Sequence, residues 1–379
     1  MEIKFGRQNR RQWLGGISLA SALLLSACGG GGTIPVAGVS DFRALPAAVM
    51  QQRATAYSPY RTSNRDTETI TKTMIEQDLA LLQQTGFGLI RLFDASDAVS
   101  RLVLEVIRER QLPIKVMLGM YVNPNAEAAN QAELDRGIAL AKAYPAEVVA
   151  LSVGNEKLVY WSFAPIDVGA MVGYIRKVRA ATTQPVTTDD NWAFFADAAA
   201  QGAKKSDPVL AEIDFVSMHS YPLLDTIYNE TLWDWKQAAV PASQRAAAMM
   251  DAAVVSLKNE YSAVRSNLDA LGHVGMPIVV GETGWKAAPS GGETQRASPV
   301  NQKMYFDRIE AWKAAGNGPA TVVHFEAFDE PWKQGDDKWG LFTVDRKARC
   351  VTQSLGTGLA ADSASCDPAQ AAYWTGSPG

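Results

Sequence analysis

Two glutamates follow apolar runs and have the types and spacing to act together in catalysis. Residues 277–285 read PIVVGETGW, so Glu282 lies at the end of a β-branched run typical of a strand buried on both faces. Residues 147–156 read EVVALSVGNE, and Glu156 ends a second such run. Carboxylates at the C-terminal ends of parallel strands can meet across the mouth of a closed sheet. Paired carboxyl groups suit glycoside hydrolysis, because one protonates the leaving oxygen while the other attacks or activates water.

Aromatic and polar side chains gather after the other apolar runs as well. Aromatic faces pack against the C–H faces of sugar rings, and carboxylates and amides bind hydroxyl groups. The residues at these positions are Tyr57, Arg91, Asp94, Tyr121, Asn155, Asp190, Trp192, Tyr221, Trp285, Glu326, Asp329, Glu330, Trp332 and Trp339. Together they predict a sugar-binding cleft.

Other kinds of chemistry find less support in the sequence. The three histidines, His219, His273 and His324, have no spacing typical of metal ligands, so we expect neither a metal nor an organic cofactor. Structural roles are expected for His273 and His324. No Gly-x-Ser-x-Gly motif is present, which argues against a serine hydrolase.

The elements that must position these residues follow a βα-repeat. Apolar runs alternate with amphipathic helical stretches from about residue 54 onward, which predicts a parallel sheet. We expect eight strands, at 54–58, 89–93, 114–120, 148–153, 185–188, 213–218, 278–280 and 320–325. Expected helices include 66–84, with Asp66 as N-cap, 167–182, capped by Asp167, and 243–271.

Eight strands with intervening helices predict an α/β fold of the (β/α)8 TIM-barrel type. A chain of 379 residues with 47% hydrophobic content can bury one large core, and we assign residues 45–350 to a single barrel domain. A doubly wound open sheet is the alternative, but the sequence has no Gly-x-Gly-x-x-Gly fingerprint. Trp233 and Trp235, in the long connection after the sixth strand, either wall the cleft or anchor their loop.

The N-terminus has the pattern of an export signal. A basic stretch precedes an apolar run at 13–25 that is too short to span a bilayer, which predicts a signal peptide at 1–27. LSAC at 25–28 resembles a lipobox, with Cys28 as the lipidated residue and 28–44 as a flexible linker. A plain signal peptide is the alternative, and RRQWL at 10–14 leaves Sec and Tat export both open.

Charge and cysteine content agree with an exported protein. The net charge is −4, and the first 28 residues carry a net +3, so the remainder stands near −7. This balance argues against nucleic acid as a partner, and we expect a monomer that touches the membrane through its lipid only. Cys350 and Cys366 could form a disulfide at the start of a C-terminal tail at 351–379. We expect a lipoprotein of the bacterial cell envelope, facing the periplasm or on the cell surface. Gly29 in place of aspartate favours the outer membrane.

Three sequence blocks resemble glycoside hydrolase family 17, the β-1,3-glucanase family, and are most similar to its bacterial and fungal branch. They are VGNE at 153–156, GETGW at 281–285, and FDEPWK at 328–333 followed by WGLF at 339–342. YSP at 57–59, IRLF at 90–93 and YP at 221–222 are further matches. The resemblance spans residues 54–342 and implies a (β/α)8 barrel with a retaining mechanism.

The resemblance also implies roles for individual residues. Glu156 matches the general acid/base and Glu282 the nucleophile. Asn155 matches the residue that holds the 2-hydroxyl of the sugar, and Tyr221 the tyrosine that hydrogen-bonds the nucleophile. The remaining implied or candidate sugar-binding residues are Tyr57, Arg91, Trp192, Trp285, Glu330, Trp332, Lys333 and Trp339. Where plant enzymes have a glutamate shortly before WGLF, this chain has Asp336 and Asp337.

These residues favour a retaining hydrolase that cleaves β-1,3-glucan through a covalent glucosyl-enzyme. A transglycosylase that passes the glucosyl unit to a second glucan is the alternative, and aromatic acceptor platforms such as Trp285 and Trp332 would favour it. A non-catalytic glucan-binding lipoprotein is a third reading, against which the two intact glutamate motifs argue. Endo or exo action, chain length and branch preference stay open.

Overall fold

The computed structural model describes residues 42–198 and 206–376. The predicted signal peptide at 1–27, the lipidation site Cys28 and most of the linker at 28–44 lie outside the described residues. Within the described ranges, no helix combines the length and the apolar character that crossing a bilayer requires.

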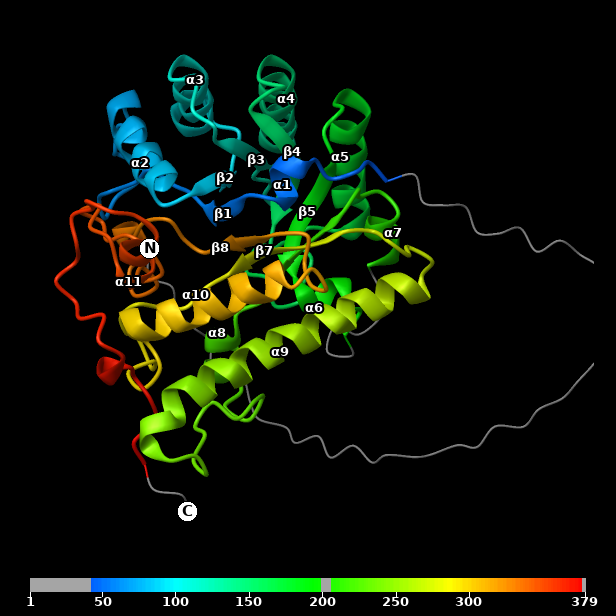
Figure 1. Ribbon diagram of the computed structural model, residues 1–379. Coiled ribbons are helices and arrows are strands. Elements are labelled where there is room, and N and C mark those ends of the chain that lie inside the picture. The colour runs from blue at the N-terminus through cyan, green and yellow to red at the C-terminus, as the bar shows by residue number, and fades with distance from the viewer. Residues whose placement is uncertain (1–41, 199–205, 377–379) are drawn as a thin grey trace, which may run out of the picture. The chain divides into compact units, whose positions relative to one another are not determined.

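Eight parallel strands close into a barrel in chain order, which confirms the predicted (β/α)8 fold (Figure 1). The strands are β1 (Arg53–Ala56), β2 (Phe87–Leu92), β3 (Lys115–Met120), β4 (Val148–Asn155), β5 (Val186–Asn191), β6 (Val216–His219), β7 (Ile278–Thr283) and β8 (Val322–His324). Closure comes from β1 pairing with β8, where Ala54 lies opposite Val323.

Most strand boundaries lie within a few residues of the prediction, and β5 shows why some do not. The prediction ends this strand at residue 188, but β5 continues through the polar residues Asp189, Asp190 and Asn191. Asp189 and Asp190 are fully buried and bonded to neighbouring groups, so the strand persists where its composition favours a loop. Tertiary contacts thus override local propensity here.

The helices surround the barrel, with α2 to α5 on one side and α9 and α10 on the opposite side (Figure 1). Their bounds are α1 (Ala47–Met50), α2 (Lys72–Gln84), α3 (Leu102–Glu109), α4 (Glu127–Ala143), α5 (Val168–Ala181), α6 (Trp192–Phe195), α7 (Asp207–Leu210), α8 (Pro222–Tyr228), α9 (Ala242–Ala270), α10 (Pro299–Ala314) and α11 (Cys350–Leu355). Short turns of other helix types are η1 (Asp97–Arg101), η3 (Pro331–Lys333) and η4 (Pro368–Gln370).

The predicted start of the first long helix at Asp66 is wrong. The helix α2 begins at Lys72, and the Thr71 hydroxyl caps it by accepting the Met74 N–H at 3.3 Å. Upstream, the Glu68 carboxylate accepts the N–H of Arg61 at 2.8 Å and so closes a loop. That loop, which helical backbone could not form, delays the helix. The Asp167 cap of α5 is present, with its carboxylate accepting the Gly169 N–H at 2.8 Å.

Two apolar layers make up the core. Side chains in and next to the strands, such as Ala54, Val279 and Phe215, form the inner layer, and Leu45 and Val49, beside and within α1, pack with them. A larger layer fills the space between the strands and the surrounding helices. Trp233 and Trp235 pack against this outer layer, and Trp233 donates its ring N–H to the Pro222 carbonyl at 3.1 Å. These two tryptophans therefore anchor their loop.

The C-terminal region runs along the barrel rather than away from it. A disulfide joins Cys350 to Cys366, with 5.4 Å between their Cα atoms. The predicted tail at 351–379 begins inside α11, whose Val351 and Thr352 side chains are buried. Further on, the Asn301 side chain on α10 donates to the Ala372 carbonyl at 2.8 Å. The described part of the tail is therefore bound to the domain.

Candidate active site

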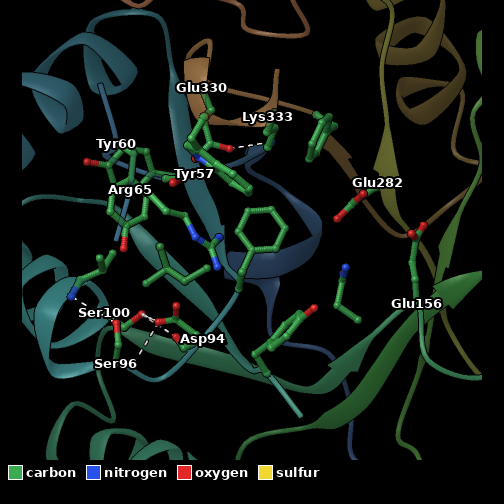
Figure 2. Close-up of a pocket in the computed structure, with 18 of the residues that line it drawn as sticks. Tyr57, Tyr60, Arg65, Asp94, Ser96, Ser100, Glu156, Glu282, Glu330 and Lys333 are labelled. Atoms are coloured by element: carbon green, nitrogen blue, oxygen red, sulfur yellow. Dashed lines mark hydrogen bonds and ion pairs between the residues drawn. The ribbon is translucent and has the colours of Figure 1, made fainter. Parts of the chain in front are cut away.

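A cleft of about 760 Å³ opens at the C-terminal ends of the strands. Nine of the twelve predicted catalytic and sugar-binding residues line it: Tyr57, Asn155, Glu156, Tyr221, Glu282, Glu330, Trp332, Lys333 and Trp339. In Figure 2, Glu156 and Glu282 lie together at one side of the cleft, with Tyr60, Arg65 and Asp94 on the far side. The barrel thus brings together carboxylates that are far apart in the sequence.

Glu156 stands on a sharp turn at the end of β4. Gly154 has φ +84° and Glu156 itself has φ +52°, so the chain turns through left-handed backbone at the point where the carboxylate is presented. The positive φ at position 154 favours glycine, and an added Cβ would also lie 2.7 Å from the Met171 terminal methyl group, which would have to shift. The Glu156 N–H donates to the Asp189 carbonyl at 2.9 Å, and the Glu156 side chain is 38% exposed. The carboxylate therefore faces the cleft from a fixed backbone.

Glu282 is held in the opposite way, with its carboxylate buried at the end of β7. One oxygen accepts the Tyr221 hydroxyl at 2.6 Å, and the other accepts the Arg91 guanidinium. Burial alone would raise the pKa of Glu282, but the charges of His219 and Arg91 and the bond from Tyr221 outweigh it and hold that pKa below its usual range. An ionised carboxylate is the state that a nucleophile needs.

His219, at the end of β6, bridges the two glutamates. Its Nδ1 lies 2.9 Å from Glu156 Oε1 and 3.5 Å from Glu282 Oε2. Burial opposes a charge on the ring, but the Glu282 charge and the hydrogen bond to Glu156 raise the pKa of His219. One ring nitrogen and one oxygen from each glutamate lie within 4.8 Å of one another, a donor set that a metal could use. Each glutamate already has hydrogen-bond partners in this network.

Arg91 is a positioning residue, which corrects its prediction as a sugar-binding residue. It is 1% exposed and does not line the cleft. Its guanidinium binds Glu282, the Asp189 carboxylate at 2.7 Å and the Asn155 side-chain oxygen at 2.6 Å. Burial disfavours the charge, but the two carboxylates outweigh it and raise the pKa of Arg91. Arg91 therefore reaches from β2 across the barrel to the ends of β4, β5 and β7.

Asp190 supports the turn that carries Glu156. Its carboxylate accepts the N–H of Leu158 at 2.7 Å and the N–H of Asn191 at 2.8 Å. Burial is the main cause that raises the pKa of Asp190 to about 7, although these N–H bonds oppose the shift. Asp190 thus connects β5 to the loop after β4.

A cluster of three charged side chains, Lys333, Glu326 and Glu330, follows β8 beside the cleft. The Lys333 ammonium lies 2.5 Å from a carboxylate oxygen of Glu326 and 2.5 Å from one of Glu330. Burial would lower the pKa of Lys333, but the two carboxylates raise it. Burial also raises the pKa of Glu326 well above its usual range, whereas the Lys333 charge overcomes burial and lowers that of Glu330. One lysine thus holds two acids that differ in their affinity for a proton.

Two of the predicted sugar-binding tryptophans do not line the cleft. Trp285 is buried, and its ring N–H donates to the Arg296 carbonyl at 2.8 Å. Trp192 begins α6 and packs against the outer core layer. Trp285 has no exposed ring face for a sugar, which corrects its prediction, whereas Trp192 is half-buried and lies outside the lining of the cleft. By contrast, Trp332 and Trp339 line the cleft, and Trp339 donates to Asp336 at 2.8 Å.

His219 and Asp189 belong to the site, although no role for them is evident from motif spacing. Both occupy the C-terminal end of a buried strand, where a polar side chain needs a partner. Glu326 follows β8 in the same way. A buried polar residue at or just after the C-terminal end of a strand is therefore the pattern that indicates them.

Comparisons with known proteins agree with this geometry. A family model described as the BtgE/BtgC glycoside hydrolase domain matches residues 54–342. The glucan 1,3-beta-glucosidase of Arthroderma benhamiae is 27% identical over 294 residues, which cover 72% of this chain and 82% of that protein.

Solved structures share the fold. An endo-laminarinase from Formosa Hel1_33_131 superposes with a TM-score of 0.75 at 24% identity, over 83% of this chain and 90% of that one. A glycoside hydrolase family 17 β-1,3-glucanosyltransferase from Rhizomucor miehei has a TM-score of 0.60 at 21% identity, over 82% of this chain and 99% of that one. Both are similar in their barrel architecture.

Proposed function

The chain belongs to the BtgE/BtgC glycoside hydrolase domain family, and on that premise we propose that it cleaves β-1,3-glucan with retention of configuration. The observation that carries the proposal is the pair formed by Glu156 and Glu282, whose oxygens lie within 4.8 Å of each other. Retaining glycosidases hold their carboxyl groups about 5–5.5 Å apart, whereas inverting ones need about 6.5–9.5 Å to admit a water. The short separation supports direct attack by one carboxylate.

In the first step, Glu156 protonates the glycosidic oxygen while Glu282 attacks the anomeric carbon. The bond from that carbon to the leaving sugar breaks, and an ester to Glu282 forms. Glu282 suits this role because Tyr221 and Arg91 bind it in its ionised form. Glu156 suits the other role because it is more exposed and can reach a departing group.

In the second step, a water gives its proton to Glu156 and its oxygen to the anomeric carbon, which releases Glu282. Esterification removes the negative charge of Glu282, so His219 then faces only the Glu156 carboxylate at 2.9 Å. That contact orients the Glu156 carboxylate toward the incoming water. The same histidine thus serves both half-reactions.

A β-1,3-glucan substrate is supported by the relative named as a glucan 1,3-beta-glucosidase and by the inventory of the cleft. Trp332, which is half-buried, offers aromatic surface beside Lys333, while the buried Trp339 closes the cleft from behind. Transfer to a second glucan uses the same covalent intermediate and is the second candidate. The exposed aromatic side chain of Phe163, which lines the cleft on the loop after Glu156, favours it.

The testing experiment is incubation of the chain with linear β-1,3-gluco-oligosaccharides, with products followed by size and anomeric form. We expect shorter products released first as the β-anomer. Products longer than the substrate would move the assignment to transfer. Release first as the α-anomer would contradict retention, and no product from a folded protein would contradict the assigned linkage or a catalytic role.

We further propose that the protein is an exported lipoprotein, acylated at Cys28. The basic and apolar pattern of residues 1–27 supports export, and the disulfide between Cys350 and Cys366 fits an oxidising compartment. Labelling of bacterial cells with a radioactive fatty acid should mark the parent chain and not Cys28→Ser. Equal labelling of both would contradict acylation at this residue.

A further inference from the structure

Three aromatic side chains cluster on the loop that follows Glu156. Tyr160 is 61% exposed, Trp161 48% and Phe163 87%, and the rings of Tyr160 and Trp161 meet edge to face at 4.8 Å. Single exposed aromatics are ordinary on protein surfaces, but a cluster of them marks an interaction site. Phe163 also lines the catalytic cleft, so the cluster is continuous with the site.

The loop is held in place, so its aromatic side chains are presented on a fixed backbone. Leu158 and Val159 are buried beneath it, and Leu158 donates its N–H to Asp190 at 2.7 Å. The Ser162 hydroxyl donates to the carbonyl of Glu156 at 2.7 Å. A pre-formed surface costs less conformational entropy on binding than a mobile one.

Lys157 couples this loop to the neighbouring wall of the cleft. Its buried ammonium lies 4.3 Å from the Tyr121 ring centroid and 5.4 Å from that of Phe163, and it donates to the Tyr121 hydroxyl at 3.1 Å. Tyr121 and Phe163 both line the cleft. The two aromatic residues therefore share one cation that fixes their relative placement.

The position relative to the two glutamates identifies which sugar units this surface meets. The acid/base protonates the leaving sugar and later accepts the proton of the incoming group, so the aglycone side of the cleft lies next to Glu156. Tyr60, Arg65 and Asp94 line the far side of the cleft from both glutamates (Figure 2). The loop after Glu156 thus lies on the aglycone side.

We propose that Trp161 and Phe163 form a platform for the glucose units of β-1,3-glucan on the aglycone side, and this inference rests on the proposed function. In the first half-reaction the platform holds the leaving portion. In the second it holds an acceptor glucan, whose hydroxyl oxygen forms the new bond to the anomeric carbon. The proton of that hydroxyl passes to Glu156 and the ester to Glu282 breaks, so the transfer balances without another reactant.

A lipid surface is the competing occupant, and the charge of the loop argues against it. Aromatic side chains that enter a membrane interface are usually accompanied by exposed lysine or arginine. Residues 158–166 read LVYWSFAPI and carry no charge, and the adjacent Lys157 is buried. Sugar rings, with their apolar C–H faces, need no such cation.

The test compares two substrates that share a glycone, using the full chain. Laminaripentaose extends onto the platform, whereas the leaving group of β-laminaribiosyl fluoride is a single atom. For Phe163→Ala and Trp161→Ala we expect the ratio of kcat/KM for the pentaose to that for the fluoride to fall about threefold to tenfold. Tyr228→Ala is the matched control, because Tyr228 is 79% exposed and does not line the cleft. This control should keep the parental ratio.

An unchanged ratio in Phe163→Ala would overturn the platform, and so would equal losses on both substrates, which would mean that the substitution displaces Glu156. Loss of binding to phospholipid vesicles together with an unchanged ratio would assign the surface to a membrane instead. If the parent turns over neither substrate, the proposed function fails separately. Calorimetric binding of laminaripentaose then decides the platform: weaker binding by Phe163→Ala supports it, and equal binding overturns it.

Discussion

Two buried carboxyl groups, one at a strand end and one on an outer helix, differ in how strongly they bind a proton. Glu282 on β7 is surrounded by Arg91, Tyr221 and His219, and its pKa is lowered despite burial. Glu260 on α9 faces Asp225, a second acid, and burial followed by that charge raises the pKa of Glu260 to about 8. The difference teaches that donors and cations, rather than depth, decide which buried acid stays ionised.

The two groups are connected through one short segment. The Ser220 hydroxyl donates to Glu260 at 2.5 Å, while the Ser220 N–H donates to the Glu282 carbonyl at 3.1 Å. Tyr221, the next residue, binds the Glu282 carboxylate. Glu282, whose pKa is lowered, and Glu260, whose pKa is raised, are therefore both bonded to the segment formed by Ser220 and Tyr221.

Removing the ionised member of the comparison should have the largest effect. Glu282→Gln keeps the shape but removes the nucleophile, so we expect turnover to fall by roughly 10⁴-fold or more. The measurement is kcat on a β-1,3-gluco-oligosaccharide, with circular dichroism as the check on folding. Activity within tenfold of the parent in a folded variant would contradict the assigned nucleophile.

Removing the cation should come next. Arg91→Met leaves Glu282 and Asp189 buried without their shared partner, and breaking a buried pair costs about 3–5 kcal/mol. We expect a lower free energy of unfolding in urea together with a loss of activity.

The matched control for this change is Arg101→Met, which breaks an exposed pair with Asp97. Exposed pairs contribute about 0–1 kcal/mol, so its unfolding should stay close to that of the parent. An equal decrease in the free energy of unfolding in Arg91→Met and Arg101→Met would show that the buried network stabilises the fold no more than an exposed ion pair does.

A milder change removes one donor and keeps the cation. The Tyr221 hydroxyl lowers the pKa of Glu282, so Tyr221→Phe should raise that pKa and move the acidic limb of the pH–activity profile to higher pH. A hydrogen bond to a charged group contributes about 1.5–3 kcal/mol, which corresponds to about tenfold to hundredfold in rate.

Tyr261→Phe serves as the control, because the Tyr261 hydroxyl donates to the Gly318 carbonyl at 3.0 Å and the residue does not line the cleft. Its profile should match that of the parent. An acidic limb that stays in place in Tyr221→Phe would mean that Tyr221 does not set the charge of Glu282.

The smallest effect should come from Glu260 and its neighbour Asp225, and it should appear in the pH dependence of the free energy of unfolding. Burial raises the pKa of Asp225 and of Glu260 to about 7 and about 8, above their ordinary values of 3.8 and 4.5. The folded state therefore binds more protons than the unfolded state, and stability is lost as the pH rises from about 4 to about 8.

Glu260→Gln removes one of these titrating groups. The decrease in the free energy of unfolding between pH 5 and pH 8 should therefore be smaller in this variant by on the order of 2 kcal/mol. Urea unfolding of parent and variant at pH 5 and pH 8 measures it. A parent that is equally stable at both pH values would contradict the raised pKa values.

The sequence predicts much of the fold because strand and helix periodicities are local. The eight apolar runs, the Asp167 cap and the strand-end positions of Glu156 and Glu282 follow from neighbouring residues alone. The start of α2 does not, because Glu68 is used to close a loop onto Arg61. That bond spans only seven residues, but it is one of several local contacts that the sequence allows.

Sequence is less informative about which direction a strand-end side chain points. Trp285 and Trp332 both follow a strand and are both aromatic, yet Trp285 enters the helix layer while Trp332 lines the cleft. The same limit applies to Arg91 and His219, whose partners come from strands 63 to 191 positions away in the chain. Contacts of that range depend on the closed barrel, which composition does not encode.

Closure of the barrel also has a consequence for biogenesis. The Thr55 hydroxyl on β1 donates to the His324 carbonyl on β8 across 269 positions, so the first strand must wait for the last before the sheet can close. Parallel sheets with such distant pairing gain their contacts late in folding. A growing chain, or one truncated before β8, therefore lacks a complete cleft. Only molecules in which β1 has paired with β8 contribute to the measured turnover.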